Sequence, residues 1–448
     1  MKLLKIGISG VRGIVGETIT PELVMDFASA FGTSLGGGRI LVARDTRLSG
    51  PMLHSASLAA LMSTGCDVLD LGICPTPILQ ALVATFKARG GISITAGHNG
   101  SAWNALAFIN REGTYLNAFQ GEEILDIFHL GRFRKAPHSK LGRVRRPEGF
   151  LDLYFRRLAA FVDRRAIAGA RFKVALDPCN GAGAGIVDRF AEALGFELVP
   201  VNNEPSGYFP HDPEPRPRNA AEVASIVKIA GADAGFLMNS DVSRVSAVAE
   251  DGETLSEEYT FPLAAGQRLG RDPGPIITNF STSRMIEDVA AAAGRPVIRA
   301  RVGQSHIVQA LLAEEGSVGG EGSGGVAVRS FQPAFDGFLA MGLVLEAMAL
   351  GGKKLSELVQ ALPKYHIVKE KVYCPPSRVH CVMDGIGQYL AGTRPTLVDG
   401  IKVEDRNGWI HIRPSATEPM IRIIAENISQ EKARDELDRV AAQITRLV

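Results

Sequence analysis

Cysteine and aromatic residues are scarce in this chain. Its 448 residues include five cysteines, an odd number with no C-x-x-C pair, which argues against a disulfide framework or a zinc ribbon and predicts inert, buried thiols. Apolar runs are too short to cross a bilayer, so no membrane partner is expected. The N-terminal segment begins like a signal peptide but meets Gly10 and Arg12 before a long apolar region forms. The sequence therefore predicts a cytoplasmic protein.

A surplus of charge of either sign is also missing. Lysine and arginine together number 49, aspartate and glutamate 48, and the net charge is +1. Binding to a phosphate backbone needs surplus basic residues, so this balance argues against a nucleic-acid partner but leaves room for a small local anion site. The basic segment at residues 132–147 has few aromatic residues for stacking on bases, and we interpret it as a solvated connection.

Glycine, by contrast, is abundant at 49 residues, which is typical of a chain with many tight βα turns. The order strand, polar turn, helix, strand starts near residues 39, 172 and 275 and predicts related α/β domains with mixed sheets. In the first, we expect strands at 39–43, 67–71 and 91–95, a helix at 51–64 and a loop at 72–77. Residues 205–217 contain five prolines and should be irregular.

The last part of the chain, from about Tyr365, loses this alternation. Strands are expected at residues 400–403, 409–413 and 420–425, followed by a helix at 430–447. The sequence therefore predicts a smaller C-terminal α+β domain after three α/β domains. By length alone, roughly three or four domains were to be expected.

Six polar motifs follow predicted strands in order along the chain, at residues 9–13, 44–50, 95–104, 239–244, 320–325 and 413–419. Together they resemble those of the α-D-phosphohexomutase superfamily, which includes phosphoglucomutase, phosphomannomutase and phosphoglucosamine mutase. The resemblance covers essentially the whole chain. It implies four domains arranged around a central cleft, which we place at residues 1–147, 148–250, 251–364 and 365–448.

The resemblance also implies a reaction, in which members move a phosphoryl group between C1 and C6 of a hexose through a phosphoserine. Here Gly97 stands at the serine position and has no oxygen to accept a phosphoryl group. Ala107 stands where the family commonly has a proton-transfer lysine. His98, through a ring nitrogen, and Ser101, through its hydroxyl, are candidate substitute acceptors. We favour a structural or orienting role for His98, as for the family histidine at this position.

The metal loop departs from the family pattern in the same way. Members hold Mg²⁺ with three aspartates in Asp-Gly-Asp-x-Asp-Arg, whereas residues 239–244 read Asn-Ser-Asp-Val-Ser-Arg and keep only Asp241 as a carboxylate. Mg²⁺ is a hard cation that carboxylate and phosphate oxygens hold best. Although the resemblance implies Mg²⁺, the sequence therefore predicts weak or no metal binding, with Asp241 as a turn residue.

The remaining loops keep more of the family pattern. Glu321 and Ser323 match residues that contact sugar hydroxyls, while Gly325 replaces a histidine; a plain glycine-rich connection is the other interpretation. The phosphate loop is kept best, since charged and hydroxyl donors grip phosphate oxygens. Its candidates are Arg413, Ser415, Thr417 and the nearby Arg422. Further cations that could line a positive cleft, or pair with carboxylates, are Arg12, Arg44, Arg47 and Arg244.

These departures fall on the groups that perform chemistry. We therefore expect a diverged homologue that binds a phosphorylated sugar or similar ligand without the usual mutase reaction and has a regulatory or partner-binding role. It would act as a homo-oligomer or in a hetero-oligomer with an active homologue. The alternatives are an active phosphosugar mutase and a phosphotransfer enzyme that uses His98 or Ser101 as its acceptor.

Overall fold

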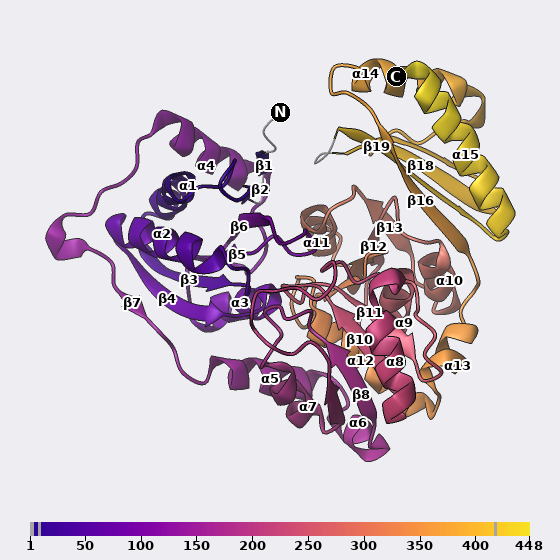
Figure 1. Ribbon diagram of the computed structural model, residues 1–448, viewed down its shortest axis with the longest axis horizontal. Helices are drawn as coiled ribbons and strands as arrows, with labels where there is room; N and C mark the ends of the chain where they lie inside the picture. The colour runs from indigo at the N-terminus through magenta and orange to yellow at the C-terminus, as the bar shows by residue number, and fades with distance from the viewer. Residues whose placement is uncertain (1–3, 8–9, 416–418) are drawn as a thin grey trace.

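A computed structural model describes residues 4–7, 10–415 and 419–448. In this part of the chain four sheets form, each with its own helices (Figure 1). The first sheet and the last lie on opposite sides of the molecule, and the second and third lie between them. The prediction of three α/β units followed by an α+β unit is confirmed.

The first sheet has the strand order β1-β2-β6-β5-β3-β4-β7 and is mixed, with β3, β4, β5 and β7 parallel and β6 antiparallel to β5. The strands of this sheet are β1 (Lys5–Gly7), β2 (Gly10–Ile14), β3 (Gly38–Arg44), β4 (Cys66–Ile73), β5 (Gly90–Ile94), β6 (Trp103–Ile109) and β7 (Val144–Arg145). Its helices are α1 (Pro21–Ser34), α2 (Gly50–Ser63), α3 (Thr76–Thr85) and α4 (Ala118–Leu130).

One expectation for this unit is wrong. Residues 72–77 do not form a loop, because β4 continues to Ile73 and α3 begins at Thr76. The prolines there mark a helix start, since Pro75 is the N-cap and Pro77 lies in the first turn, where no backbone N–H is needed. The basic segment at 132–147 is largely exposed, as expected of a solvated segment, and within it β7 pairs with β4 at the edge of the sheet.

The second and third sheets repeat one topology. Their strand orders are β11-β10-β8-β9 and β13-β12-β14-β15, and in each the fourth strand runs antiparallel to the third. The second contains β8 (Lys173–Asp177), β9 (Glu197–Pro200), β10 (Ala234–Met238) and β11 (Val245–Ala249). The third contains β12 (Ile276–Asn279), β13 (Val297–Ala300), β14 (Val318–Glu321) and β15 (Gly325–Val328). The core of the first sheet, β6-β5-β3-β4, has the same order, so the three units are related as predicted.

Helices cover these two sheets and join them to the first. They are α5 (Phe150–Phe161), α6 (Arg164–Ala170), α7 (Val187–Leu194), α8 (Ala221–Ala230), α9 (Thr260–Gly266), α10 (Met285–Ala292), α11 (Gln304–Ala313), α12 (Gly337–Gly351) and α13 (Leu355–Gln360). Helix α12 is buried along most of its length, and its residues share one apolar core with Leu41 of the first unit and Phe190 of the second. This continuous core fixes the first three units relative to one another.

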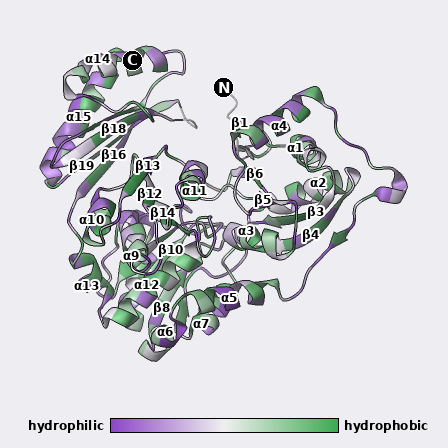
Figure 2. Cartoon of the chain, turned by 180° about the vertical axis from the view of Figure 1, so that it is seen from behind, coloured by the Kyte–Doolittle hydropathy of each residue, from purple (hydrophilic) through white to green (hydrophobic). Residues whose placement is uncertain are grey.

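The fourth sheet is fully antiparallel, with the order β16-β19-β18-β17. It contains β16 (His366–Tyr373), β17 (Ile401–Glu404), β18 (Gly408–Pro414) and β19 (Met420–Asn427), with α14 (Val379–Tyr389) and α15 (Gln430–Leu447) packed against it. Hydrophobic residues concentrate on the inner elements, whereas α15 carries both kinds (Figure 2). This unit has an apolar core of its own.

The thiols and helices test two expectations drawn from composition. Cys66, Cys74, Cys179 and Cys374 are free and buried as predicted, but Cys381 is exposed, because it lies on the outer face of α14. Among the residues that the structure describes, no helix is both long enough and apolar enough to cross a membrane.

Candidate functional site

The candidate site lies where equivalent loops of the first three units meet. In each unit the loop joins the third strand to the antiparallel fourth: β5 to β6, β10 to β11, and β14 to β15. These loops carry Gly97, Asp241 and Ser323. The shared topology therefore brings three of the predicted motifs together.

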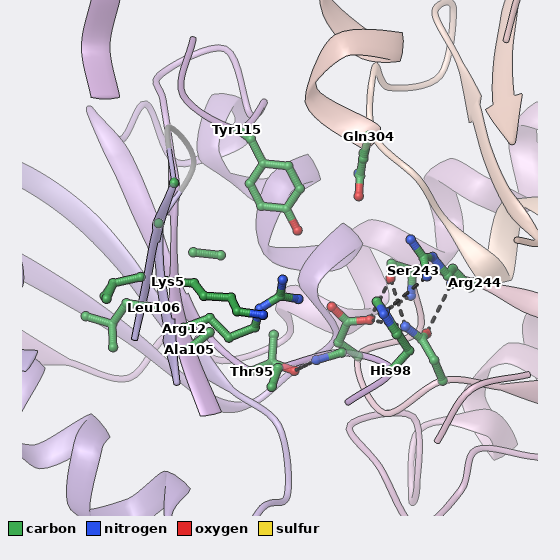
Figure 3. A pocket seen from close by; sticks show the side chains of 18 of the residues that line it. Lys5, Arg12, Thr95, His98, Ala105, Leu106, Tyr115, Ser243, Arg244 and Gln304 are labelled. Carbon is green, nitrogen blue, oxygen red and sulfur yellow. Dashed lines mark hydrogen bonds between the residues drawn. The ribbon is translucent and has the colours of Figure 1, made fainter. Parts of the chain in front are cut away.

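Two adjoining hollows surround these loops, and both are lined by His98 and Arg244. The first hollow is lined mainly by the first and second units, with Gln304 of the third. Figure 3 shows Tyr115 and Gln304 facing it from opposite sides. The second hollow is also lined by the loop at residues 321–325 of the third unit, which we call the sugar loop, and by Arg413 and Arg422 of the fourth unit. All four units thus contribute to one cleft.

The loop with Gly97 is held from below by a buried arginine. Arg47 is 1% exposed and donates to the carbonyl oxygens of Gly97 at 3.0 Å, Asn99 at 2.6 Å and Gly100 at 2.6 Å. Asp45 accepts from Nε of Arg47 at 2.9 Å, and burial raises the pKa of Asp45 although the guanidinium opposes this. Arg47 is therefore part of the scaffold and does not line the cleft.

Gly97 has a φ of 56°, in the left-handed region that favours glycine. A Cβ added there would lie 3.7 Å from Nδ2 of Asn239 and 3.7 Å from Oδ2 of Asp241, which are ordinary contact distances. A side chain at this position would thus point at the former metal loop. Space does not exclude a serine, whereas the backbone conformation disfavours one.

The carboxylate of Asp241 is surrounded by hydrogen-bond donors. Oδ1 accepts from Nδ2 of Asn239 at 2.8 Å, from Oγ of Ser243 at 2.7 Å and from its backbone N at 3.2 Å. Oδ2 accepts from Oγ1 of Thr76, the first residue of α3, at 3.1 Å. The two residues that replace family aspartates therefore donate to the remaining one, where carboxylates would have shared a cation.

This donor set does not fit Mg²⁺. The cation needs oxygen acceptors, preferably several carboxylates, and here the neighbours of Asp241 supply N–H and O–H groups. Within residues 4–7, 10–415 and 419–448, no group of three or more His, Cys, Asp or Glu side chains is arranged to hold a metal. Asp241 acts instead as the centre of a closed turn, in which Val242 has a φ of 63°.

His98 is held by a hydrogen bond from Arg244 in its neutral form. Nη1 of Arg244 donates to Nδ1 of His98 at 3.0 Å, so the ring proton lies on Nε2. Burial and the nearby charges of Arg244 and Arg12 lower the pKa of His98 well below its usual range. Neither ring nitrogen then offers a free lone pair, which agrees with an orienting role. Ser101 is exposed and lines a separate hollow beside Tyr208.

Hydrogen bonds hold the loop at residues 321–325, which joins β14 to β15. Oε1 of Glu321 accepts from Nη2 of Arg244 at 2.9 Å and from Ser323, and Oε2 accepts from Asn279 at 3.1 Å. A Cβ on Gly322 would lie 1.9 Å from the Glu258 carboxylate, so any larger residue there would require the Glu258 side chain to move. The loop is therefore not a loose glycine-rich connection.

The position of the family histidine in this loop is filled from elsewhere in the chain. A Cβ on Gly325 would lie 2.3 Å from the ring of Phe335, a fully buried residue. The ring thus occupies the start of the space that any side chain at 325 would need.

Two cations lie on the strands β18 and β19, on either side of the loop that joins them. Arg413 and Arg422 lie opposite each other in the register of β18 and β19, and both line the second hollow. Like charges placed so destabilise a sheet unless an anion lies between them. Among the residues that the structure describes, Nε of Arg413 is buried without a hydrogen-bond partner. Burial, and to a smaller extent the charge of Arg422, lowers the pKa of Arg413. Ser415 is half-buried beside them, and Thr417 lies outside the described residues.

Of the other predicted cations, Arg12 and Arg244 line the first hollow, while Arg44 turns away and donates to the carbonyl oxygen of Asp45. Sequence reasoning missed Lys5 and Tyr115, which also line that hollow. The strand that carries Lys5 has three residues, too few for a periodic pattern. The signal that could have revealed Lys5 is the sequence Lys-x-Gly at residues 5–7, which closely precedes Gly-x-Arg at residues 10–12.

Comparison with known proteins shows the family to which this chain belongs. Models of phosphoglucomutase/phosphomannomutase match the chain in order: alpha/beta/alpha domain I at residues 3–135, domain II at 152–252, domain III at 256–365 and the C-terminal domain at 378–443. The chain belongs to the phosphoglucomutase/phosphomannomutase family. The resemblance drawn from the six motifs is thereby confirmed.

Individual relatives span the whole chain. A phosphoglucomutase/phosphomannomutase of Thermococcus kodakarensis is 36% identical over 441 residues, covering 96% of both proteins. A probable phosphoglucosamine mutase of Methanopyrus kandleri is 34% identical over 447 residues, covering 99% of this chain and 98% of the relative. A crystal structure of a family protein from Burkholderia thailandensis superposes with a TM-score of 0.84 at 25% identity, covering 98% and 96%.

Proposed function

We propose that this family member binds a phosphorylated sugar in its cleft and does not catalyse the usual mutase reaction. One observation carries the proposal: the Asp241 carboxylate is occupied by donors from Asn239, Ser243 and Thr76, directly beside Gly97. A phosphoryl group needs an acceptor atom and a counter-charge during transfer. Gly97 offers no acceptor atom, and the donors around Asp241 leave no carboxylate oxygen open to a metal cation.

Ligand binding is supported by the charges that remain. Arg244, Arg413 and Arg422 line the second hollow together with Glu321 and Ser323 of the sugar loop. Guanidinium groups bind phosphate oxygens through charge-assisted hydrogen bonds, while carboxylate and hydroxyl groups pair with sugar hydroxyls. The family relatives are named for hexose phosphates, which have this combination of groups.

A protein that binds such a ligand without converting it can have an effect only through the other molecules that it binds. We therefore infer a regulatory or partner-binding role, in a homo-oligomer or in a hetero-oligomer with an active homologue. Phosphosugars are intracellular metabolites, and this supports the cytoplasmic localisation expected from the sequence.

Two measurements test the proposal. A phosphomutase assay on hexose 1-phosphates, with the 1,6-bisphosphate and Mg²⁺ present, should give no turnover above background. Thermal unfolding with hexose 6-phosphates should show a ligand-induced rise in Tm that Arg413→Ala abolishes. Turnover at the rate of ordinary mutases would favour the active-mutase alternative, and a phosphorylated protein detected by intact mass, lost in His98→Ala or Ser101→Ala, would favour a substitute acceptor.

A further inference from the structure

The first sheet has an edge strand that its two related sheets lack. In the second and third sheets β9 and β13 are the edges, and β4 holds the corresponding place in the first. Here β7 pairs with β4 and becomes the new edge. Figure 1 shows β7 at the outer margin of the first unit, away from the fourth. The described residues that line the two hollows of the cleft include none from 132–147.

The backbone of the basic segment at 132–147 is fixed to the first unit. The backbone N of Gly142 donates to the carbonyl oxygen of Met62 at 3.0 Å, and the carbonyl oxygen of Arg143 accepts from the backbone N of Val68 at 2.8 Å. A Cβ on Gly142 would collide with the carbonyl oxygen of Cys66, so glycine permits this close approach. The segment therefore presents its side chains from a defined position.

The charge of this segment is of one sign. It contains no acidic residue and seven basic ones, all exposed: Arg132, Arg134, Lys135, Lys140, Arg143, Arg145 and Arg146. Arg134 donates to the carbonyl oxygen of Gly36, and Arg146 pairs with Asp70. Among the residues described, the side chains of the other five have no hydrogen bond or ion pair. Because the whole chain has a net charge of +1, the rest of the chain is net acidic and this surface is a local concentration of positive charge.

The backbone of β7 has an open side. In a parallel pair, successive residues direct their backbone groups to opposite sides of the strand. Since the carbonyl oxygen of Arg143 bonds to β4, the N–H and C=O groups of Val144 point away from β4. Such groups are a template for one more strand, while basic side chains on an edge discourage strands of like charge. An acidic strand satisfies both conditions.

These features favour a protein partner over a nucleic acid or a lipid surface. Phe133 is the only Phe, Trp or Tyr of the segment, and it packs against the apolar core of the first unit, so no such ring is available to stack on bases. A nucleic acid or a lipid headgroup would match the charge but would leave the N–H and C=O groups of Val144 without a ladder partner. A peptide backbone supplies that partner.

We propose that β7 and the basic segment form a docking surface for an extended acidic segment of a partner protein. The partner's segment adds as a strand beside β7 and places its carboxylates against Arg143 and Arg145, which lie on one face of the strand because they are two residues apart. This surface serves the partner-binding role proposed above. It does not require that the cleft bind a phosphosugar.

Fluorescence anisotropy with the full chain tests this proposal. The probe is a short labelled peptide in which glutamate alternates with valine, and its control has proline at alternate valines, which keeps the charge but removes backbone N–H groups. The first peptide should bind at least about tenfold tighter than the second, because only the first can form a complete ladder. A single-stranded oligonucleotide and phosphatidylserine vesicles should compete poorly with the first peptide.

Two variants locate the binding surface. Arg143→Glu combined with Arg145→Glu should weaken binding of the first peptide at least about tenfold, since attraction becomes repulsion. Lys353→Glu combined with Lys364→Glu makes the same change of charge at exposed positions elsewhere and should leave the affinity within about twofold. Val144→Pro removes an N–H that points away from β4, at an edge position where proline is tolerated, and should weaken binding with little change in Tm.

Each contrary outcome has a distinct meaning. Unchanged affinity in the Arg143→Glu, Arg145→Glu variant, or no binding of the first peptide, overturns the docking surface. Equal affinity for the two peptides overturns strand addition, and this comparison decides the matter if Val144→Pro does not fold. Tighter binding of the oligonucleotide or the vesicles would also overturn the proposal. The Tm rise with hexose 6-phosphates tests the proposed function separately, since its absence leaves peptide binding unaffected.

Discussion

Arg47 and Asp45 form an ion pair that is buried beneath the loop carrying Gly97, with both side chains at most 1% exposed. The guanidinium of Arg47 also donates to backbone carbonyl oxygens of that loop. Asp45 accepts a further hydrogen bond from Oγ1 of Thr95 at 2.7 Å. The shape of the loop is therefore set by the protein itself. Neither a metal nor a phosphorylated residue is needed to hold it.

Removing this arginine should be costly. Arg47→Met leaves Asp45 buried without its counter-charge, and we expect a loss of about 3–5 kcal/mol in the free energy of unfolding, measured with urea. Arg111→Met is the control, because Arg111 pairs with Glu112 on the surface. Equal stability of the two variants would show that Arg47 does not support the loop.

Metal dependence should appear only when carboxylates are restored. We expect Mg²⁺ and EDTA to leave the Tm of the natural chain unchanged, because Asp241 is saturated by donors. Asn239→Asp combined with Ser243→Asp should lower the Tm without metal and give a rise on addition of Mg²⁺. Asp241→Asn in that background should remove the rise, and a Mg²⁺-induced shift in the natural chain would contradict the closed turn.

Restoring the hydroxyl alone should not restore catalysis. Gly97→Ser has room for its Cβ but places an L-residue at a φ of 56°, which should cost about 1–2 kcal/mol in the free energy of unfolding. Gly97→Ala carries the same backbone cost without a hydroxyl and is the matched control. A mutase assay on Gly97→Ser should stay at background; turnover there would mean that a metal or another cation serves this site.

The stability of the natural chain should fall as the pH rises above neutrality. Burial alone would lower the pKa of His211, but hydrogen bonds to Asp177 and Cys179 outweigh it and raise the pKa to about 11. The charged histidine therefore stabilises the fold fully below its usual pKa near 6.5, and this contribution is lost as the pH approaches 11.

Urea unfolding at pH 6 and pH 9 measures this effect. The natural chain should lose stability by up to about 1.4 kcal/mol per pH unit more than His211→Asn does. His380→Asn is the control, because its partner Asp384 is on the surface and the pair is exposed. An identical pH dependence in the natural chain and His211→Asn would rule out a charged His211.

The sequence was most informative where periodicity and motif order agree. Repeated strand–turn–helix patterns predicted the three related units, and their topology explains why the loops of Gly97, Asp241 and Ser323 meet. Several strands were not predicted, among them β1, which is very short, and β16, which is rich in charged residues. The boundaries at residues 147, 250 and 364 stay predictions.

Other features depend on contacts that a linear pattern does not contain. The donor from Thr76 reaches Asp241 from a helix of another unit, 165 residues away in sequence. Arg47 matched a family motif and was expected either to line the cleft or to pair with a carboxylate; it pairs with Asp45, two residues before it, and the pair is buried in the interior. Tertiary packing, more than local composition, decided the roles of these residues.

The ring of Phe335 beside Gly325 bears on how this lineage can change. A histidine returned to position 325 would first collide with that ring, and a carboxylate returned to 239 or 243 would first face Asp241 with no cation between them. We expect each of these substitutions, made singly, to destabilise the fold. The residues at 239, 243 and 325 are each matched to their surroundings, so the family pattern could be introduced into this cleft only through several substitutions made together.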